Sequence, residues 1–302
     1  MKFKNKVIVI VGQTAVGKSD LAVNLAKKFN AEIISADSRQ VYKGLNIGTG
    51  KITKKEMCGI PHHLLDVANP KRKFTVAQYK KLADKKIKEI IKRKKLPIII
   101  GGTGFYIQSI VNNVTYPEVP PNKALRKKLE KWHAHKLFEI IKKQDPRRAN
   151  SIDPKNKIRL IRAIEIIKKI EKVPDLVVGQ PSEEFLEIGL KIDDVELRER
   201  INKRLLARIK SGMIAEAKKL HENGLSWKRM EELGLEYKYL SKYLKNEINK
   251  TKMIEELGNN IWHYAKRQKT WFKRNKNIKW FDLAKKREEE EIYRLVNDFL
   301  LK

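Results

Sequence analysis

The stretch that decides the fold is Gly12-Gln13-Thr14-Ala15-Val16-Gly17-Lys18-Ser19, which fits the phosphate-binding pattern G-x-x-x-x-G-K-[ST] at every fixed position. An apolar run at 7–11 predicts a buried strand before it, and apolar residues at helical spacing over 20–28 predict a helix after it. Such a turn directs backbone N–H groups and the helix N-terminus at one point, which suits a chain of phosphates. We therefore expect a nucleotide-type P-loop, as in ATP-binding proteins, in which Lys18 adds positive charge and the Ser19 hydroxyl is a ligand for Mg²⁺.

Further strands and helices alternate along the chain on both sides of its middle part. Apolar runs predict strands at 31–36, 97–100, 184–192 and 278–282, and amphipathic spacing predicts helices at 74–95, 195–211 and 288–301. Alternation of this kind is typical of α/β proteins with a parallel sheet. The expected fold is a P-loop NTPase-like core in which helices flank a parallel β-sheet.

The middle of the chain has a different texture. Prolines at 117, 120 and 121 and at 174 and 181 mark two boundaries, and charged amphipathic helices are predicted between them at 123–131, 137–143 and 157–169. We expect residues 113–182 to form an inserted all-helical domain. Residues 1–112 and 183–302 would then form one discontinuous catalytic core.

The composition limits the partners and the compartment. The 68 basic and 36 acidic residues give a formal charge of +32, which favours a polyanionic partner such as nucleic acid, although a lysine-rich genome would give the same balance. The single cysteine, Cys58, excludes an internal disulfide and a multi-cysteine zinc site. The sequence shows no signal-peptide pattern and no long apolar segment, so we expect a soluble, cytoplasmic protein without membrane contact.

Two candidate site residues follow predicted strands. Asp37 comes directly after the strand at 31–36, where residues line the ligand crevice of an open α/β sheet, and it is a candidate base or, equally, a helix N-cap. Thr103 ends the run Gly101-Gly102-Thr103 after the strand at 97–100. A hydrolysing P-loop enzyme would often carry a magnesium-binding acid there, whereas this chain has a neutral hydroxyl. A tight packing turn is the alternative interpretation of the two glycines.

Cations and aromatic residues dominate the second half of the chain. Arg200 and Arg204 lie four residues apart on the helix predicted at 195–211, an arrangement that suits a diphosphate or an ordinary solvated surface. Aromatic residues alternate with cations at 234–239 and 262–274. Such segments can stack on unpaired bases and pair with phosphates, or they can pack on the core under a basic surface.

Together, the motifs resemble the tRNA dimethylallyltransferases over almost the whole chain. The resemblance rests on the P-loop with Thr14 and on four further runs: Ile34-Ser35-Ala36-Asp37-Ser38-Arg39-Gln40-Val41-Tyr42-Lys43-Gly44, Asn46-Ile47-Gly48-Thr49-Gly50-Lys51, Gly101-Gly102-Thr103 and Ala265-Lys266-Arg267-Gln268-Lys269-Thr270-Trp271. Two places depart from the family pattern. Gly50 stands where many members carry alanine, and Glu236-Tyr237-Lys238 stands where many have Gly-Tyr-Arg or Gly-Tyr-Lys.

The resemblance implies a reaction and roles for the catalytic residues. A dimethylallyl group would pass from dimethylallyl diphosphate to N6 of the adenosine that adjoins the tRNA anticodon on its 3′ side, with release of diphosphate. Asp37 would accept a hydrogen bond and then the proton from N6, and Thr103 and Arg204 would bind the diphosphate. The P-loop residues 12–19 would bind the same diphosphate, with Mg²⁺ at Ser19.

The resemblance also implies tRNA contacts at six places along the chain. These are Asp37, Ser38, Arg39 and Gln40; Thr103; Arg126 with Ile158, Arg159, Leu160, Ile161 and Arg162; Leu233, Gly234, Leu235, Glu236, Tyr237 and Lys238; and Lys266, Arg267, Gln268, Lys269, Thr270, Trp271, Phe272 and Lys273. The expected partners are a tRNA anticodon stem-loop and dimethylallyl diphosphate, bound by a monomer. Alternatives are a P-loop small-molecule kinase, an adenylate isopentenyltransferase acting on free AMP, and a non-catalytic RNA-binding protein switched by a nucleotide.

Overall fold

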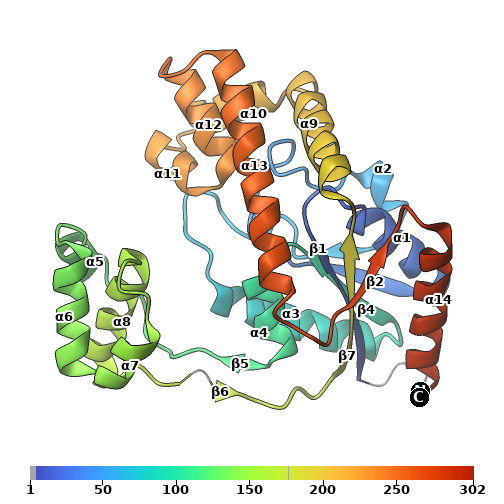
Figure 1. The fold of residues 1–302 in the computed structure, drawn as a ribbon, viewed down its shortest axis with the longest axis horizontal. Helices are drawn as coiled ribbons and strands as arrows, with labels where there is room; N and C mark the ends of the chain where they lie inside the picture. Colours follow the sequence, from blue (N-terminus) through green and yellow to red (C-terminus); the bar gives the residue numbers. More distant parts are fainter. Residues whose placement is uncertain (1–4, 176) are drawn as a thin grey trace. The chain divides into compact units, whose positions relative to one another are not determined.

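The computed structural model describes residues 5–175 and 177–302 (Figure 1). The chain divides into two compact units, one made of Met1–Asn112 with Pro181–Lys302 and the other of Asn113–Gln180. Residues 1–4, within the predicted core, and residue 176, within the predicted insertion, lie outside the described residues. In the part of the chain that is described, no helix is both long enough and apolar enough to cross a membrane.

A six-stranded parallel sheet forms the centre of the larger unit. Its strand order is β3-β2-β4-β1-β7-β8, with bounds β3 His62–His63, β2 Ala31–Ser35, β4 Leu96–Gly101, β1 Lys6–Gly12, β7 Glu184–Lys191 and β8 Lys279–Asp282. The residues of β1 from Val7 to Val11 have no exposed surface, as expected for a central strand covered on both faces. The predicted α/β fold with a parallel sheet is confirmed. The short polar strand β3 has no apolar run to reveal it, and the sequence analysis missed it.

Helices pack against this sheet and supply the walls of the site. α1 (Lys18–Phe29) packs on β1, β2 and β4, α3 (Val76–Lys92) on β2 and β4, and α14 (Lys286–Leu301) on β7 and β8. The other helices of the unit are α2 (Lys54–Met57), α4 (Gly104–Val111), α9 (Asp194–Lys210), α10 (Met213–Glu222), α11 (Trp227–Glu232), α12 (Leu235–Leu244) and α13 (Lys250–Phe272). α3 begins two residues later than predicted because Thr75 and Gln78 form a capping box at its start.

The smaller unit is helical apart from one short ribbon. It contains α5 (Lys123–Leu129), α6 (Ala134–Gln144), α7 (Pro146–Ser151) and α8 (Lys157–Ile170) around an apolar core of its own. β5 (Val114–Thr115) and β6 (Val177–Val178) pair antiparallel where the chain enters and leaves the unit. The sequence analysis missed α7, which Asp145 caps and Pro146 opens.

Candidate functional site

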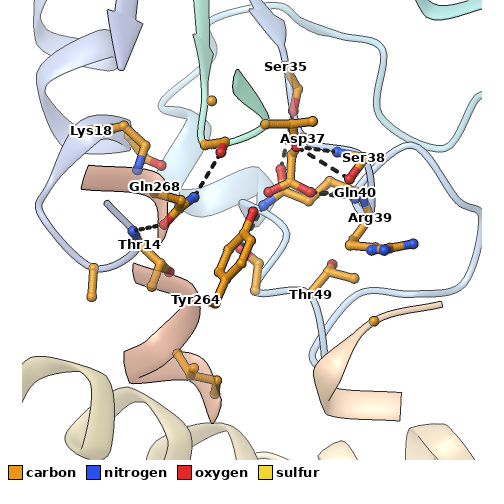
Figure 2. A pocket seen from close by; sticks show the side chains of 18 of the residues that line it. Thr14, Lys18, Ser35, Asp37, Ser38, Arg39, Gln40, Thr49, Tyr264 and Gln268 are labelled. Atoms are coloured by element: carbon orange, nitrogen blue, oxygen red, sulfur yellow. Dashed lines mark hydrogen bonds between the residues drawn. The ribbon is translucent and has the colours of Figure 1, made fainter. Parts of the chain in front are cut away.

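A cavity of about 870 Å³ lies in the larger unit where the strands end at their carboxyl side (Figure 2). The P-loop, the segment after β2 and the turn after β4 form one part of its wall. The segment at 49–65 and helices from the second half of the chain form most of the rest. Its lining includes Thr14, Lys18, Ser19, Asp37, Ser38, Arg39, Gln40, Thr49, Gly50, Gly102, Thr103, Arg200, Arg204, Arg208, Glu236, Tyr264, Gln268 and Trp271. The cavity therefore gathers most of the catalytic and P-loop residues predicted from the sequence.

The P-loop has the backbone that its glycines permit. Gly12 has φ 145°, and a Cβ on it would lie 2.6 Å from the Leu190 carbonyl oxygen of β7. Gly17 has φ 92° and ends the loop in the left-handed region directly before α1. The Lys18 ammonium donates to the carbonyls of Gly12 (3.1 Å) and Gln13 (2.5 Å). The loop thus presents a helix N-terminus and a cation to the cavity.

Unpaired positive charge marks one half of the cavity. Burial and the nearby Arg204 guanidinium lower the pKa of Lys18 to about 7. Enclosure and the neighbouring Arg208 lower the pKa of Arg204 to about 10. Within the described residues Arg204 forms no ion pair, whereas Arg200 pairs with Glu196 at 2.5 Å. Arg204, and not Arg200, is therefore free to bind an anion.

Asp37 has one oxygen engaged and one free. Its Oδ1 accepts the backbone N–H groups of Arg39 (2.8 Å) and Gln40 (3.3 Å), and its Oδ2 accepts no hydrogen bond from the described residues. The carboxylate thus caps a turn, as one interpretation expected, and still offers an acceptor to the cavity. Figure 2 shows the Tyr264 side chain directed toward Asp37. Enclosure and the Asp37 charge raise the pKa of Tyr264, so this phenol stays protonated and is able to donate.

The turn after β4 is packed against both neighbouring segments. Side chains on Gly101 and Gly102 would collide with the Ala36 carbonyl and the Gln268 amide, respectively. Gln268, from α13, accepts from the Thr14 N–H and donates to the Gly102 carbonyl, both at 2.9 Å (Figure 2). Gln268 was predicted from the sequence as an RNA contact, and its role as a clamp that holds the P-loop against the β4 turn was not predicted.

Thr103 joins the β4 turn to the segment after β2. Its Oγ1 accepts from the Ser38 N–H at 3.0 Å and lies 3.3 Å from the Ser38 Oγ, to which it donates. The packing interpretation therefore applies to the two glycines before it, while Thr103 itself places a neutral hydroxyl on the cavity wall.

Comparison with known proteins decides the family. The family model described as IPP transferase matches residues 40–275. The chain belongs to the IPP transferase family. It is similar to the tRNA dimethylallyltransferase of Anoxybacillus flavithermus, with 42% identity over 301 residues that cover 98% of this chain and 95% of the relative. The tRNA dimethylallyltransferase of Bacillus subtilis is 40% identical over 290 residues, covering 93% of this chain and 92% of the relative.

Solved structures agree with the sequence relatives. The tRNA isopentenylpyrophosphate transferase of Bacillus halodurans matches with a TM-score of 0.75 and 37% identity, covering 98% of this chain and 97% of its own. A eukaryotic dimethylallyltransferase acting on tRNA matches with a TM-score of 0.83 and 28% identity, covering 98% of this chain and 79% of its own. The resemblance predicted from the sequence motifs is confirmed.

In this IPP transferase, the predicted RNA contacts of the larger unit divide into exposed and buried residues. Lys238, Lys266, Arg267, Thr270 and Lys273 are exposed, whereas Leu233, Tyr237, Gln268 and Phe272 are buried. Tyr237 has no exposed surface, and its hydroxyl donates to Glu216 at 2.7 Å. For Tyr237 the structure supports the packing interpretation over base stacking.

The predicted contacts of the smaller unit divide in the same way. Leu160 and Ile161 belong to its core, and Ile158, 83% exposed, stands with the exposed Arg159 at the start of α8. Arg126 and Arg162 both pair with the buried carboxylate of Glu165, at 2.6 and 3.4 Å. Their guanidinium groups are thus held in place by a partner that the sequence analysis did not identify.

Arg208 is a cavity residue of this IPP transferase that sequence reasoning missed. Its guanidinium occupies the space that a side chain on Gly50 would fill, and it lies 3.8 Å from Glu236. Enclosure raises the pKa of Glu236. Both departures from the family pattern, Gly50 and Glu236, therefore contact the same arginine. Gly50 and Arg208 are far apart in the chain, so no local pattern in the sequence could have predicted their contact.

The P-loop offers one oxygen ligand, the Ser19 hydroxyl, to a magnesium ion whose other ligands would be substrate phosphates and water. The described residues contain no group of three or more His, Cys, Asp or Glu side chains placed to hold a metal. Mg²⁺ commonly keeps several waters and takes only one or two protein ligands beside substrate phosphates. The Ser19 hydroxyl, which lines the cavity at the start of α1, is suited to be such a ligand.

Proposed function

We propose that this IPP transferase moves a dimethylallyl group from dimethylallyl diphosphate to N6 of the adenosine that adjoins the tRNA anticodon on its 3′ side. The observation that carries the proposal is the division of one cavity into a cationic half, with Lys18 and Arg204, and a half that contains the free Asp37 oxygen. The names of the relatives support tRNA as the acceptor.

The proposed step breaks the bond between the allylic carbon and the diphosphate oxygen. The diphosphate leaves with the bonding electrons, N6 of the adenosine supplies the pair for the new C–N bond, and the N6 proton passes to the Asp37 carboxylate. P-loop amides, Lys18 and Arg204 would stabilise the charge that grows on the diphosphate. Thr103 would turn its hydroxyl proton from the Ser38 Oγ toward the diphosphate, a neutral contact that does not oppose that charge.

Ser19 would hold Mg²⁺ on the diphosphate, and a bound ion of this kind neutralises charge on a leaving phosphate group. The chain's own contribution is to orient the diphosphate through the loop amides and through Lys18. The walls supplied by α9, α12 and α13 would enclose the reacting groups further once both substrates are bound.

Asp37 needs only to orient an amine of low basicity and accept its proton late. The turn that fixes Oδ1 leaves Oδ2 available to the proposed acceptor, and Tyr264 is a second donor or acceptor beside it. N6 of a stacked adenosine is not accessible to such a site, so the nucleotide must be unstacked before reaction. The exposed cations on α13 and the exposed residues at the start of α8 are the proposed contacts to the rest of the RNA.

The proposed place of action is the cytoplasm, where tRNA is modified and where the exposed thiol of Cys58 would stay reduced. A test of the function uses purified protein, Mg²⁺ and labelled dimethylallyl diphosphate, with tRNA or AMP as acceptor. Mass spectrometry of ribonuclease fragments of the tRNA should show a prenylated adenosine next to the anticodon, and the reaction with AMP should give no labelled AMP. Transfer to AMP, or consumption of ATP with phosphorylation of a metabolite, would reject the proposal.

A further inference from the structure

One carboxylate outside the proposed catalytic set binds a whole turn of the cavity wall. Glu216, on α10, accepts from the backbone N–H groups of Asn46 (3.0 Å) and Ile47 (2.8 Å) through Oε2, and from Gly48 (2.9 Å) through Oε1. The Tyr237 hydroxyl of α12 donates to the same Oε1 at 2.7 Å. Three consecutive amides that converge on one point form an anion-binding concavity, and here a side chain of the protein fills it.

The turn that Glu216 holds continues directly into the cavity. The next two residues line it, Thr49 (Figure 2) and Gly50. The Gly50 carbonyl accepts from the Gln40 side chain at 3.2 Å, and the Gln40 N–H in turn donates to Asp37 Oδ1. Movement of the turn at 46–48 would therefore reach the segment that carries the proposed base.

Close packing keeps Glu216 and the turn in one arrangement. A Cβ on Gly48 would lie 2.7 Å from the Tyr237 ring, so the turn rests directly on that buried phenol. α10 and α12, which carry Glu216 and Tyr237, pack against each other (Figure 1). Within the described chain Glu216 makes no hydrogen bond to the P-loop or to Arg204, so it has no direct contact with the diphosphate half of the cavity.

We propose that Glu216 is a positioning residue for the acceptor half of the cavity, which fixes the turn at 46–50 beside Asp37 so that the adenosine is received in a reactive orientation. This inference rests on the proposed function. It also gives Tyr237 a role, as the residue that orients the Glu216 carboxylate from below the turn.

The test separates the two halves of the cavity kinetically. Glu216→Gln keeps the side-chain shape but places an NH₂ group against backbone N–H donors. We expect kcat on an anticodon stem-loop RNA to fall about 10- to 100-fold, as for a misplaced reacting group, with the inhibition constant of inorganic diphosphate changed less than about twofold. Tyr237→Phe should lower kcat in the same direction by a smaller factor. Glu222→Gln is the matched control, because Glu222 lies on the same helix and, among the described residues, forms one exposed ion pair, with Lys218 at 3.9 Å.

A second readout does not depend on activity. Hydrogen exchange should accelerate at the amides of 46–48 in Glu216→Gln, while exchange within α10 stays as in the wild type. An unchanged kcat, or a loss of diphosphate affinity as large as the loss of kcat, would overturn the inference. If Glu216→Gln does not fold, Tyr237→Phe carries both measurements. If the wild type transfers no prenyl group, the proposed function fails, and a Glu216→Gln protein without faster exchange at 46–48 would refute the positioning role separately.

Discussion

Binding of inorganic diphosphate at pH 8 should draw a proton from solution onto Lys18. In the free protein, burial and Arg204 lower the pKa of this ammonium to about 7. At pH 8 roughly one molecule in ten then carries the charge, which weakens the apparent affinity about tenfold, or by about 1.4 kcal/mol. A diphosphate adds negative charge beside Lys18 and raises its pKa again. The affinity contributed by Lys18 should therefore decrease as the pH rises above 7.

Calorimetry in two buffers of different ionisation enthalpy measures this proton directly. With the lysine nearly fully charged in the complex, the wild type should take up roughly 0.9 proton more per bound diphosphate than Lys18→Met, which lacks a titratable group there. Binding to the variant also measures the protons that the diphosphate itself takes up or releases, so the difference between the two proteins is due to Lys18. Equal proton uptake by the two proteins at pH 8 would refute the argument that Lys18 is held partly neutral for an incoming anion.

Three further results follow from the structure. Asp37→Asn keeps an acceptor for the turn and should bind tRNA while losing about 10²–10⁴ in single-turnover rate; a loss below about tenfold would contradict the proposed base. Gly50→Ala should lower the free energy of unfolding, measured in urea, more in the wild type than in an Arg208→Ala background. In that background the clash with the guanidinium is gone, and the remaining cost is that of an alanine in the left-handed region, about 1 kcal/mol. Equal losses in the two backgrounds would show that Arg208 does not occupy this space. Glu32, bound by Arg93 and His63, has its pKa lowered from 4.5 to about 2. The wild type should exceed Glu32→Gln in free energy of unfolding by up to about 3 kcal/mol. This difference should be complete above pH 4.5 and disappear as the pH falls through 2.

Local patterns were enough to predict the core of the fold. The P-loop and the apolar runs of β1, β4 and β7 each specify their structure within a few residues, and the resulting parallel sheet was found. β3 and α7 are short, and their bounds depend on pairing with β2 and on the Asp145 cap, so their own residues carry little signal.

Parts of the site could be predicted because topology brings them together. β2 and β4 are neighbours in the sheet, so residues after their carboxyl ends meet, and Thr103 and Ser38 do so at 3.0 Å. Glu216, Arg208 and Gln268 were missed in their roles because each acts on a segment more than 150 residues earlier in the chain. Helix packing decides such contacts, and helical spacing alone does not reveal them.

The neutral end of β4 explains why the cations of the cavity stay available. A carboxylate in place of Thr103 would share the cavity with Lys18 and Arg204 and would pair with them in the free protein. An entering diphosphate would then have to displace that carboxylate, and the leaving group would form beside a like charge. With threonine, Asp37 offsets only part of the repulsion between Lys18 and Arg204, and a bound anion would relieve the rest. A P-loop beside a strand that is followed by Thr103 rather than by an acid is therefore suited to a reaction in which diphosphate leaves a carbon atom. A hydrolase would need an acid at that place to position the metal ion and the attacking water.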